Sequence, residues 1–156
     1  MKKIITTFGA VLFASLIITN EAKAQVSVGA NIGMFKFFDF VPQFGFNLNG
    51  KYSINDKIRV GANLGYYFND GFITMPITGL FEYSFSDNDF SPYAGADIGI
   101  YRFAGSGLFG LAPVVGLNYN LSDNLLLNSN LKYHYIMSEG GSLSAFGVNA
   151  GVSYKF

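Results

Sequence analysis

The sequence contains no cysteine, and only 13% of its residues are charged. Without cysteine the chain forms no disulfide bond and no thiolate metal site. Its single histidine, His134, leaves no convincing set of transition-metal ligands, and we expect no cofactor. Soluble domains carry about 25% charged residues. A chain this poor in charge therefore needs an environment other than water for part of its surface.

Positive charge is not in excess either. Ten Lys and Arg residues are balanced by ten Asp and Glu residues, and residues 25–156 taken alone have a formal net charge of −2. Nucleic-acid-binding domains concentrate basic residues, so composition argues against that class of protein.

Residues 1–24 have the three parts of a secretory signal peptide. MKK is basic, IITTFGAVLFASLIIT is apolar, and AKA at Ala22–Ala24 provides small residues before Gln25. The alternative is a transmembrane anchor, but the apolar run is short and no basic stop-transfer residues follow it. We expect export, cleavage before Gln25 and a single domain over residues 25–156.

No helical period runs through any segment after Gln25, and alternation with a period of two takes its place. The pattern predicts eight strands of about ten residues, the length a tilted strand needs to cross a bilayer. Three copies of one strand, VGANIGMF, VGANLGYY and AGADIGIY, make the arrangement a repeat of hairpins. The eight segments are VSVGANIGM, QFGFNLNGKYSI, IRVGANLGYYF, ITMPITGLFEYSF, PYAGADIGIY, LAPVVGLNYNL, LLLNSNLKYHY and FGVNAGVSYKF.

Two kinds of connection alternate between these segments. NDK, SDND and SDN are polar and tight. KFFDFVP, NDGF, FAGSGLF and SEGGSL carry more aromatic residues and glycine and are longer on average. We expect the second group to surround one end of the molecule, which we call the mouth.

The size of the alternating residues indicates which face is outside. A soluble lipocalin-type barrel would have its apolar face inside and charged residues in water, but here the polar face consists mainly of Gly, Asn, Ser and Thr. Such small residues fit the interior of an eight-stranded barrel, whereas the Phe, Tyr, Leu, Ile and Val of the other face are too bulky for it. We predict an all-β fold, an antiparallel up-and-down transmembrane β-barrel with lipid outside.

Four tyrosines end strands next to the tight connections, and all are predicted to face outward. A tyrosine at a membrane interface keeps its ring in lipid and its hydroxyl in water, so we expect these residues to form an aromatic girdle. They are Tyr52, Tyr83, Tyr119 and Tyr154.

The last strand, with Tyr154 outward and Phe156 at its end, resembles the assembly signal of outer-membrane β-barrel proteins. The whole of residues 25–156 resembles the small barrels of the OmpA, OmpX and OmpW type. This resemblance implies a bacterial outer-membrane location with both termini and the tight turns in the periplasm. It also implies contact with outer-membrane lipids, the secretion machinery and the β-barrel assembly machinery. We expect a monomer.

The charged residues of the inner face should seal the lumen. Pairing Phe68 with Ile73 across NDGF makes paired residue numbers sum to 141, so Arg59 should lie opposite Glu82. Lys51 should lie near the same end, and Asp97 should pair with Lys132 across Gly116. A bulge near Pro76 is where this register is most easily lost. The predicted polar cluster of the lumen is Lys51, Arg59, Glu82, Asp97, Lys132 and His134.

Five aromatic residues fall in or beside the predicted mouth loops: Phe37, Phe38, Phe40, Phe103 and Phe109. They form either an upper girdle or a mouth that accepts an apolar ligand. Three functions follow: a structural or interaction protein with a plugged lumen, a channel or binder for small hydrophobic or amphipathic solutes, and a lipid-modifying enzyme. The enzyme is the remote alternative, since His134 faces the predicted lumen while Ser138 lies in a loop. We expect no catalysis.

Overall fold

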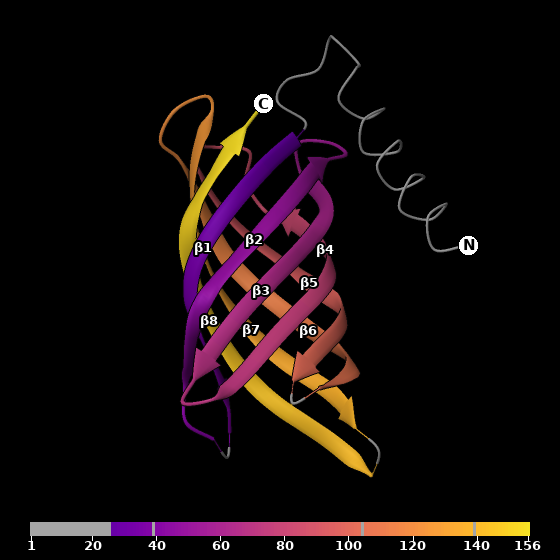
Figure 1. The fold of residues 1–156 in the computed structure, drawn as a ribbon. Helices are drawn as coiled ribbons and strands as arrows, with labels where there is room; N and C mark the ends of the chain where they lie inside the picture. The colour runs from indigo at the N-terminus through magenta and orange to yellow at the C-terminus, as the bar shows by residue number, and fades with distance from the viewer. Residues whose placement is uncertain (1–25, 39, 104, 139) are drawn as a thin grey trace, which may run out of the picture.

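Eight antiparallel strands close into a barrel in which each strand pairs with its neighbour in the sequence and the last pairs with the first (Figure 1). The computed structural model describes residues 26–38, 40–103, 105–138 and 140–156. The signal peptide expected over residues 1–24 lies outside these residues. The strands are β1 (Val26–Phe37), β2 (Gln43–Ser53), β3 (Ile58–Asn69), β4 (Phe72–Ser84), β5 (Phe90–Phe103), β6 (Ser106–Asn120), β7 (Leu125–Ser138) and β8 (Gly141–Lys155).

The strands are 11 to 15 residues long, longer than the alternation alone predicts. The additional residues lie toward the mouth, where β6 begins at Ser106 and β8 at Gly141. Glycine-containing segments at the mouth, which the sequence pattern assigns to loops, are therefore parts of strands. The part of the chain that the structure describes contains no helix long and apolar enough to cross a membrane.

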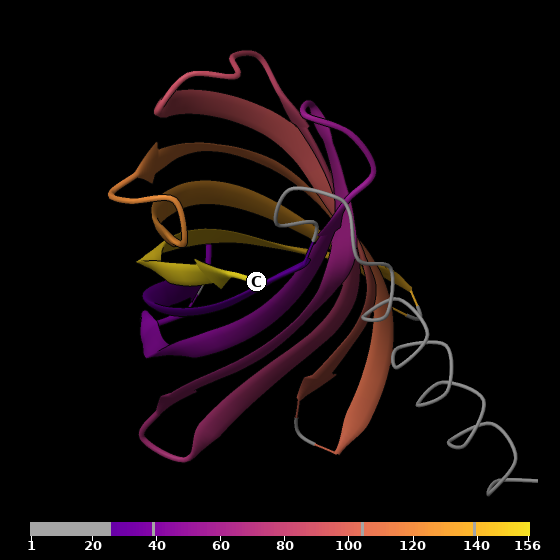
Figure 2. The ribbon, with the colours of Figure 1, turned by 90° about the horizontal axis from the view of Figure 1, so that it is seen from above.

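The two ends of the barrel differ in their connections. At one end, which we call the terminal end, the Phe156 N–H donates a hydrogen bond of 2.9 Å to the carbonyl oxygen of Val26. Residues 54–57, 85–89 and 121–124 connect strands there, and Figure 2 looks down on this end, with yellow β8 beside indigo β1. The mouth has connections at residues 38–42, 70–71, 104–105 and 139–140. The expectation that mouth loops are longer on average is wrong, since three of the four contain two residues.

The register is the one that the sequence predicts between β3 and β4. Arg59 pairs with Glu82 and Phe68 pairs with Ile73. Pro76 interrupts the ladder, because proline has no N–H to donate. The pairing of Leu64 with Ile77 nevertheless continues in the same register on the other side of the interruption. No residue is inserted, so the register does not slip at Pro76 between these two strands. Asp70 and Gly71 join the strands with φ angles of 38° and 89°, as a two-residue type I′ turn requires.

The two faces of the barrel separate as predicted, with large apolar side chains outside and asparagine, serine, threonine and glycine inside. The expectation that bulky side chains stay out of the lumen is wrong. Inward glycines make the room: a Cβ atom at Gly110 would meet the ring of Tyr101, and one at Gly116 would meet the ring of Tyr93. The bulky buried side chains of the inner face are Phe35, Phe37, Tyr67, Leu80, Tyr93, Tyr101, Val114, Leu126 and Ile136.

Two glycines on adjacent strands should respond oppositely to alanine. A Cβ at inward Gly95 would overlap the carbonyl oxygen of Phe81, whereas outward Gly79 has no atom nearer than 3.8 Å. Gly95→Ala should destabilise the barrel by about 1–3 kcal/mol through overpacking. Gly79→Ala should be neutral or stabilise it by about 0.4–1 kcal/mol. Urea unfolding in lipid vesicles measures both, and equal effects would contradict this assignment of faces.

Candidate functional site: a filled lumen below an apolar mouth

A charged cluster crosses the lumen near the terminal end. Glu82 on β4 binds two cations, Lys51 on β2 and Arg59 on the adjacent β3. Its Oε1 lies 2.7 Å from Lys51 Nζ, and its Oε2 lies 3.4 Å from Arg59 Nε. The Lys51 and Glu82 side chains are buried, and that of Arg59 is 15% exposed. One carboxylate therefore ties three adjacent strands together inside the barrel.

Glycine and tyrosine accommodate these charges. Gly61 is the β3 partner of Lys51, and Gly95 is the β5 partner of Glu82, so each of these side chains has a neighbour without a side chain on one of its two sides. The ring of Tyr93 covers both cations, with its centroid 5.7 Å from Lys51 Nζ and 5.7 Å from Arg59 Cζ. Cations are attracted to aromatic faces at such distances. The charges are thus enclosed by protein rather than by open water.

A second ion pair lies farther along the lumen. Lys132 Nζ on β7 is 2.5 Å from Asp97 Oδ2 on β5, and both side chains are buried. β6 runs between these strands, with Ala112 opposite Asp97 and Val114 opposite Lys132. The expected pair is present, but it spans Ala112 and Val114 and not Gly116. Lys51, Arg59, Glu82, Asp97 and Lys132 together form what we call the charged layer.

Four asparagines and one tyrosine form a hydrogen-bonded network, which we call the asparagine layer. Asn47 receives a bond of 2.7 Å from Asn31 and donates one of 3.0 Å to Asn149. The Tyr67 hydroxyl donates to Asn149 at 2.6 Å, and Asn149 donates to Asn130 at 3.1 Å. This network joins β1, β2, β3, β7 and β8 across the lumen. The alternating pattern in the sequence predicts that these asparagines face inward. It does not show which of them form hydrogen bonds with one another.

Aromatic and aliphatic side chains fill the lumen at the mouth. Phe35 packs against Phe37 and Tyr67 at centroid distances of 5.1 and 5.5 Å. We call this set the aromatic cluster: Phe35, Phe37, Tyr67, Tyr101, Ile136 and Ala145, with Phe103, Leu108 and Leu143 packed against it. Sequence reasoning missed most of its members because their inward position became clear only with the longer strands.

His134 lies inside the lumen against the aromatic cluster. Its Nδ1 is 2.8 Å from the Tyr101 hydroxyl, and its ring centroid is 4.7 Å from that of Phe35. All six side chains of the predicted polar cluster thus face the lumen. Five of them are ion-paired, while His134 is bonded to a tyrosine.

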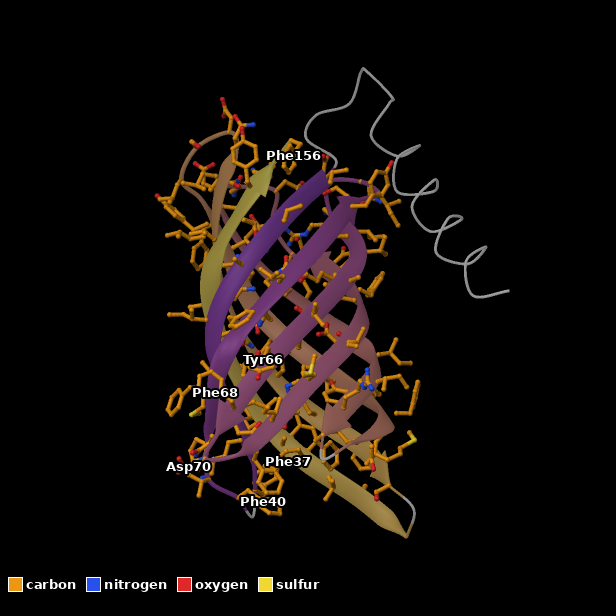
Figure 3. All side chains as sticks on the ribbon, viewed as in Figure 1. Phe37, Phe40, Tyr66, Phe68, Asp70 and Phe156 are labelled. Carbon is orange, nitrogen blue, oxygen red and sulfur yellow. The ribbon has the colours of Figure 1, made fainter. Side chains whose placement is uncertain are left out.

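The five predicted mouth aromatics separate into two groups. Phe37, Phe40 and Phe103 line a cavity of about 230 Å³ at the mouth. Figure 3 shows Phe37 and Phe40 close together there, with Asp70 at the same end and Phe156 at the opposite one. Phe38 is 61% exposed and its ring contacts that of Tyr133, which is on the outer face. The expectation of a mouth loop at Phe109 is wrong, because Phe109 lies within β6 with its side chain exposed on the outer face.

The four girdle tyrosines lie in the last residues of β2, β4, β6 and β8, at the terminal end. Tyr83 and Tyr154 are exposed there and pack edge to face on Phe85 and Phe156 at centroid distances of 5.5 and 5.0 Å. Val26, the first described residue, and Phe156 therefore share one end of the barrel with the girdle. The periplasmic orientation of that end and the role of Tyr154 and Phe156 in assembly stay predictions.

Comparison with known proteins gives one family match and several similar barrels. The family described as outer membrane protein beta-barrel domain matches residues 6–156. An uncharacterized protein of Haemophilus influenzae is 30% identical over 97 residues, which are 53% of this chain and 52% of that protein. The chain thus spans about half the length of this curated relative.

Solved structures share the fold at low identity. Neisserial surface protein A is 23% identical with a TM-score of 0.69, over 84% of this chain and 96% of that one. The N-terminal β-barrel domain of Pseudomonas aeruginosa OprF is 19% identical with a TM-score of 0.61, over 83% and 97%. The outer membrane enzyme PagL is 11% identical with a TM-score of 0.51, over 83% and 99%. Because the same fold occurs in an enzyme, the fold alone does not show whether this chain is catalytic. Its activity has to be argued from its side chains.

Proposed function

Because the chain belongs to the outer membrane protein β-barrel family, we propose that it has a structural or interaction role in the bacterial outer membrane, with a lumen sealed against ions and solutes. Its outer face meets lipid, as the large apolar side chains there require. The described side chains of the interior hold the wall strands together, and a sealed lumen requires that they leave no continuous path for water.

The free space inside the barrel carries this proposal. A cavity of only about 10 Å³ lies among the charged and asparagine layers, lined by residues that include Lys51, Glu82, Asp97 and Lys132. A single water molecule needs about 10–15 Å³ of such space. A hydrated ion is larger than one water molecule, so it has no route past these side chains without breaking an ion pair.

The observations give less support to a channel and to an enzyme. A channel for hydrophobic solutes would need an apolar path from the mouth into the barrel, but Phe38 and Phe109 are on the outer face and the aromatic cluster fills the lumen below the mouth. A serine–histidine lipid hydrolase would need His134 beside a serine on the lipid face. His134 is buried in the lumen with Tyr101, which supports a role without catalysis.

Conductance measurements on the purified protein test the proposal. Inserted into a planar lipid bilayer in potassium chloride, the unmutated barrel should give no steady current, and liposomes that contain it should not swell in small sugars. A known porin in the same bilayer is the positive control. A steady open current from the unmutated protein would show that the lumen is not sealed.

A further inference from the structure

The mouth holds a cavity that the sealed lumen does not explain. Its volume is about 230 Å³, and its walls are largely apolar, with the rings of Phe37, Phe40, Phe72 and Phe103 among them. Phe40 lies 5.9 Å from Phe37 and 6.2 Å from Phe72 between ring centroids. Phe37 and Phe103 also belong to or pack on the aromatic cluster, so this mouth pocket lies above the filled lumen.

Gln43 gives the mouth pocket an unused hydrogen-bond acceptor. This side chain lines the pocket and is only 3% exposed, yet its Oε1 has no hydrogen-bond partner. A buried acceptor without a donor is costly, and most such atoms in folded proteins are paired. The neighbouring Asn69 donates one amide N–H to the Pro42 carbonyl at 2.7 Å, and none of the described residues donates to Gln43 Oε1. A ligand with an N–H group would satisfy the acceptor.

Asp70 adds a negative charge at the same pocket. It is exposed, belongs to the two-residue turn between β3 and β4, and lines the cavity together with Gln43. Among the described residues that line the pocket there is no lysine, arginine or histidine to neutralise this carboxylate. The phenyl rings of the wall also attract cations through their faces. Acceptor, carboxylate and rings together favour a head group that is both a donor and positively charged.

We propose that the mouth pocket binds a small primary amine with an apolar body. The ammonium group donates to Gln43 Oε1 and lies near the Asp70 carboxylate, while the apolar body packs on the phenyl rings. A volume of about 230 Å³ admits a molecule of about ten non-hydrogen atoms. This binding goes beyond the proposed role and is independent of it, since the pocket lies above the lumen whose conductance tests that role.

Two probes of equal charge isolate the hydrogen bond. Protonated 4-phenylbutylamine has N–H donors, whereas its isomer benzyltrimethylammonium has the same number of atoms and the same charge but no donor. Binding is measured by calorimetry with the barrel in lipid nanodiscs, and empty nanodiscs serve as the blank for partition into lipid. The primary amine should bind about tenfold more tightly, as a hydrogen bond from a charged donor predicts. If the unmutated protein binds both probes with equal affinity, or binds neither probe, the proposal is overturned.

Variants assign the effect to Gln43. Gln43→Leu keeps the approximate volume and removes the acceptor, so the tenfold preference for the primary amine should fall to about one. Asn118→Leu is the matched control: Asn118 is also a buried amide with unpaired atoms, but it pairs with Ser91 and Asn128 near the terminal end. The Asn118→Leu variant should keep the tenfold preference for the primary amine. A preference that survives in Gln43→Leu, or disappears equally in both variants, contradicts the assignment.

Discussion

The Glu82→Ala variant should lose about 3–5 kcal/mol of folding free energy and should conduct ions that the unmutated barrel excludes. Glu82 is the carboxylate that both Lys51 and Arg59 contact. Alanine leaves two cations facing each other inside the barrel without a counterion. Breaking a buried ion pair from one side is costly because the remaining charge has lost both water and partner. The shortened side chain also opens space in the charged layer, where water can enter.

Urea unfolding in vesicles and single-channel recording in planar bilayers measure the two effects. Glu82→Gln separates charge from volume, since it removes the charge but still fills the lumen; it should be destabilised and conduct less than Glu82→Ala. Asp123→Ala, an exposed carboxylate in the connection 121–124, should change neither property. If Glu82→Ala has the same unfolding midpoint as the unmutated protein and also gives no current, the charged layer is not the seal.

The Phe35→Ala variant should lose a similar amount of stability, about 3–5 kcal/mol, but should stay closed to ions. Phe35 is 1% exposed and its ring contacts those of Phe37, Tyr67 and His134. Its removal leaves a cavity in the aromatic cluster, and the cost of such cavities rises with their volume. Conductance should not follow, because the charged layer farther along the lumen still blocks the path.

A phenylalanine of the outer face is the matched control for this loss. Phe46 is 49% exposed and packs on Tyr66 at 5.8 Å, and the Phe46→Ala variant should lose less stability because lipid fills the space. Combining Phe35→Ala with Glu82→Ala should give a larger current than Glu82→Ala alone, because the charged layer is the main barrier to ions and the aromatic cluster adds a smaller resistance in series with it. A steady current in Phe35→Ala alone would mean that the intact charged layer does not block ions.

The strand register followed from strict alternation and turn length, and it was predictable from the sequence. The contacts among side chains from several strands inside the lumen were not predictable. Arg59 opposite Glu82 followed from a two-residue turn and strict alternation, which together fix a register. The inward position of Tyr101 also followed from alternation, but the room for its ring comes from Gly110 on the next strand. The missing partner of Gln43 depends on atoms from several strands and has no local signal. The mouth end of β6 was missed because SGLF contains a glycine that reads as a loop.

The hydrogen bonds between β1 and β8 determine the order in which the barrel can be completed. Seven of the eight pairings join strands that are consecutive in the sequence and can form from local hairpins. The eighth brings Ser27 to Lys155 and thus joins opposite ends of the folded domain. Contacts between residues so distant along the chain form slowly, because the entropy of a long loop is lost before they are made. Until then β1 and β8 are both unpaired edges, which are open to pairing with other chains. The chain is therefore most exposed to aggregation before closure, which we expect to be the last pairing to form.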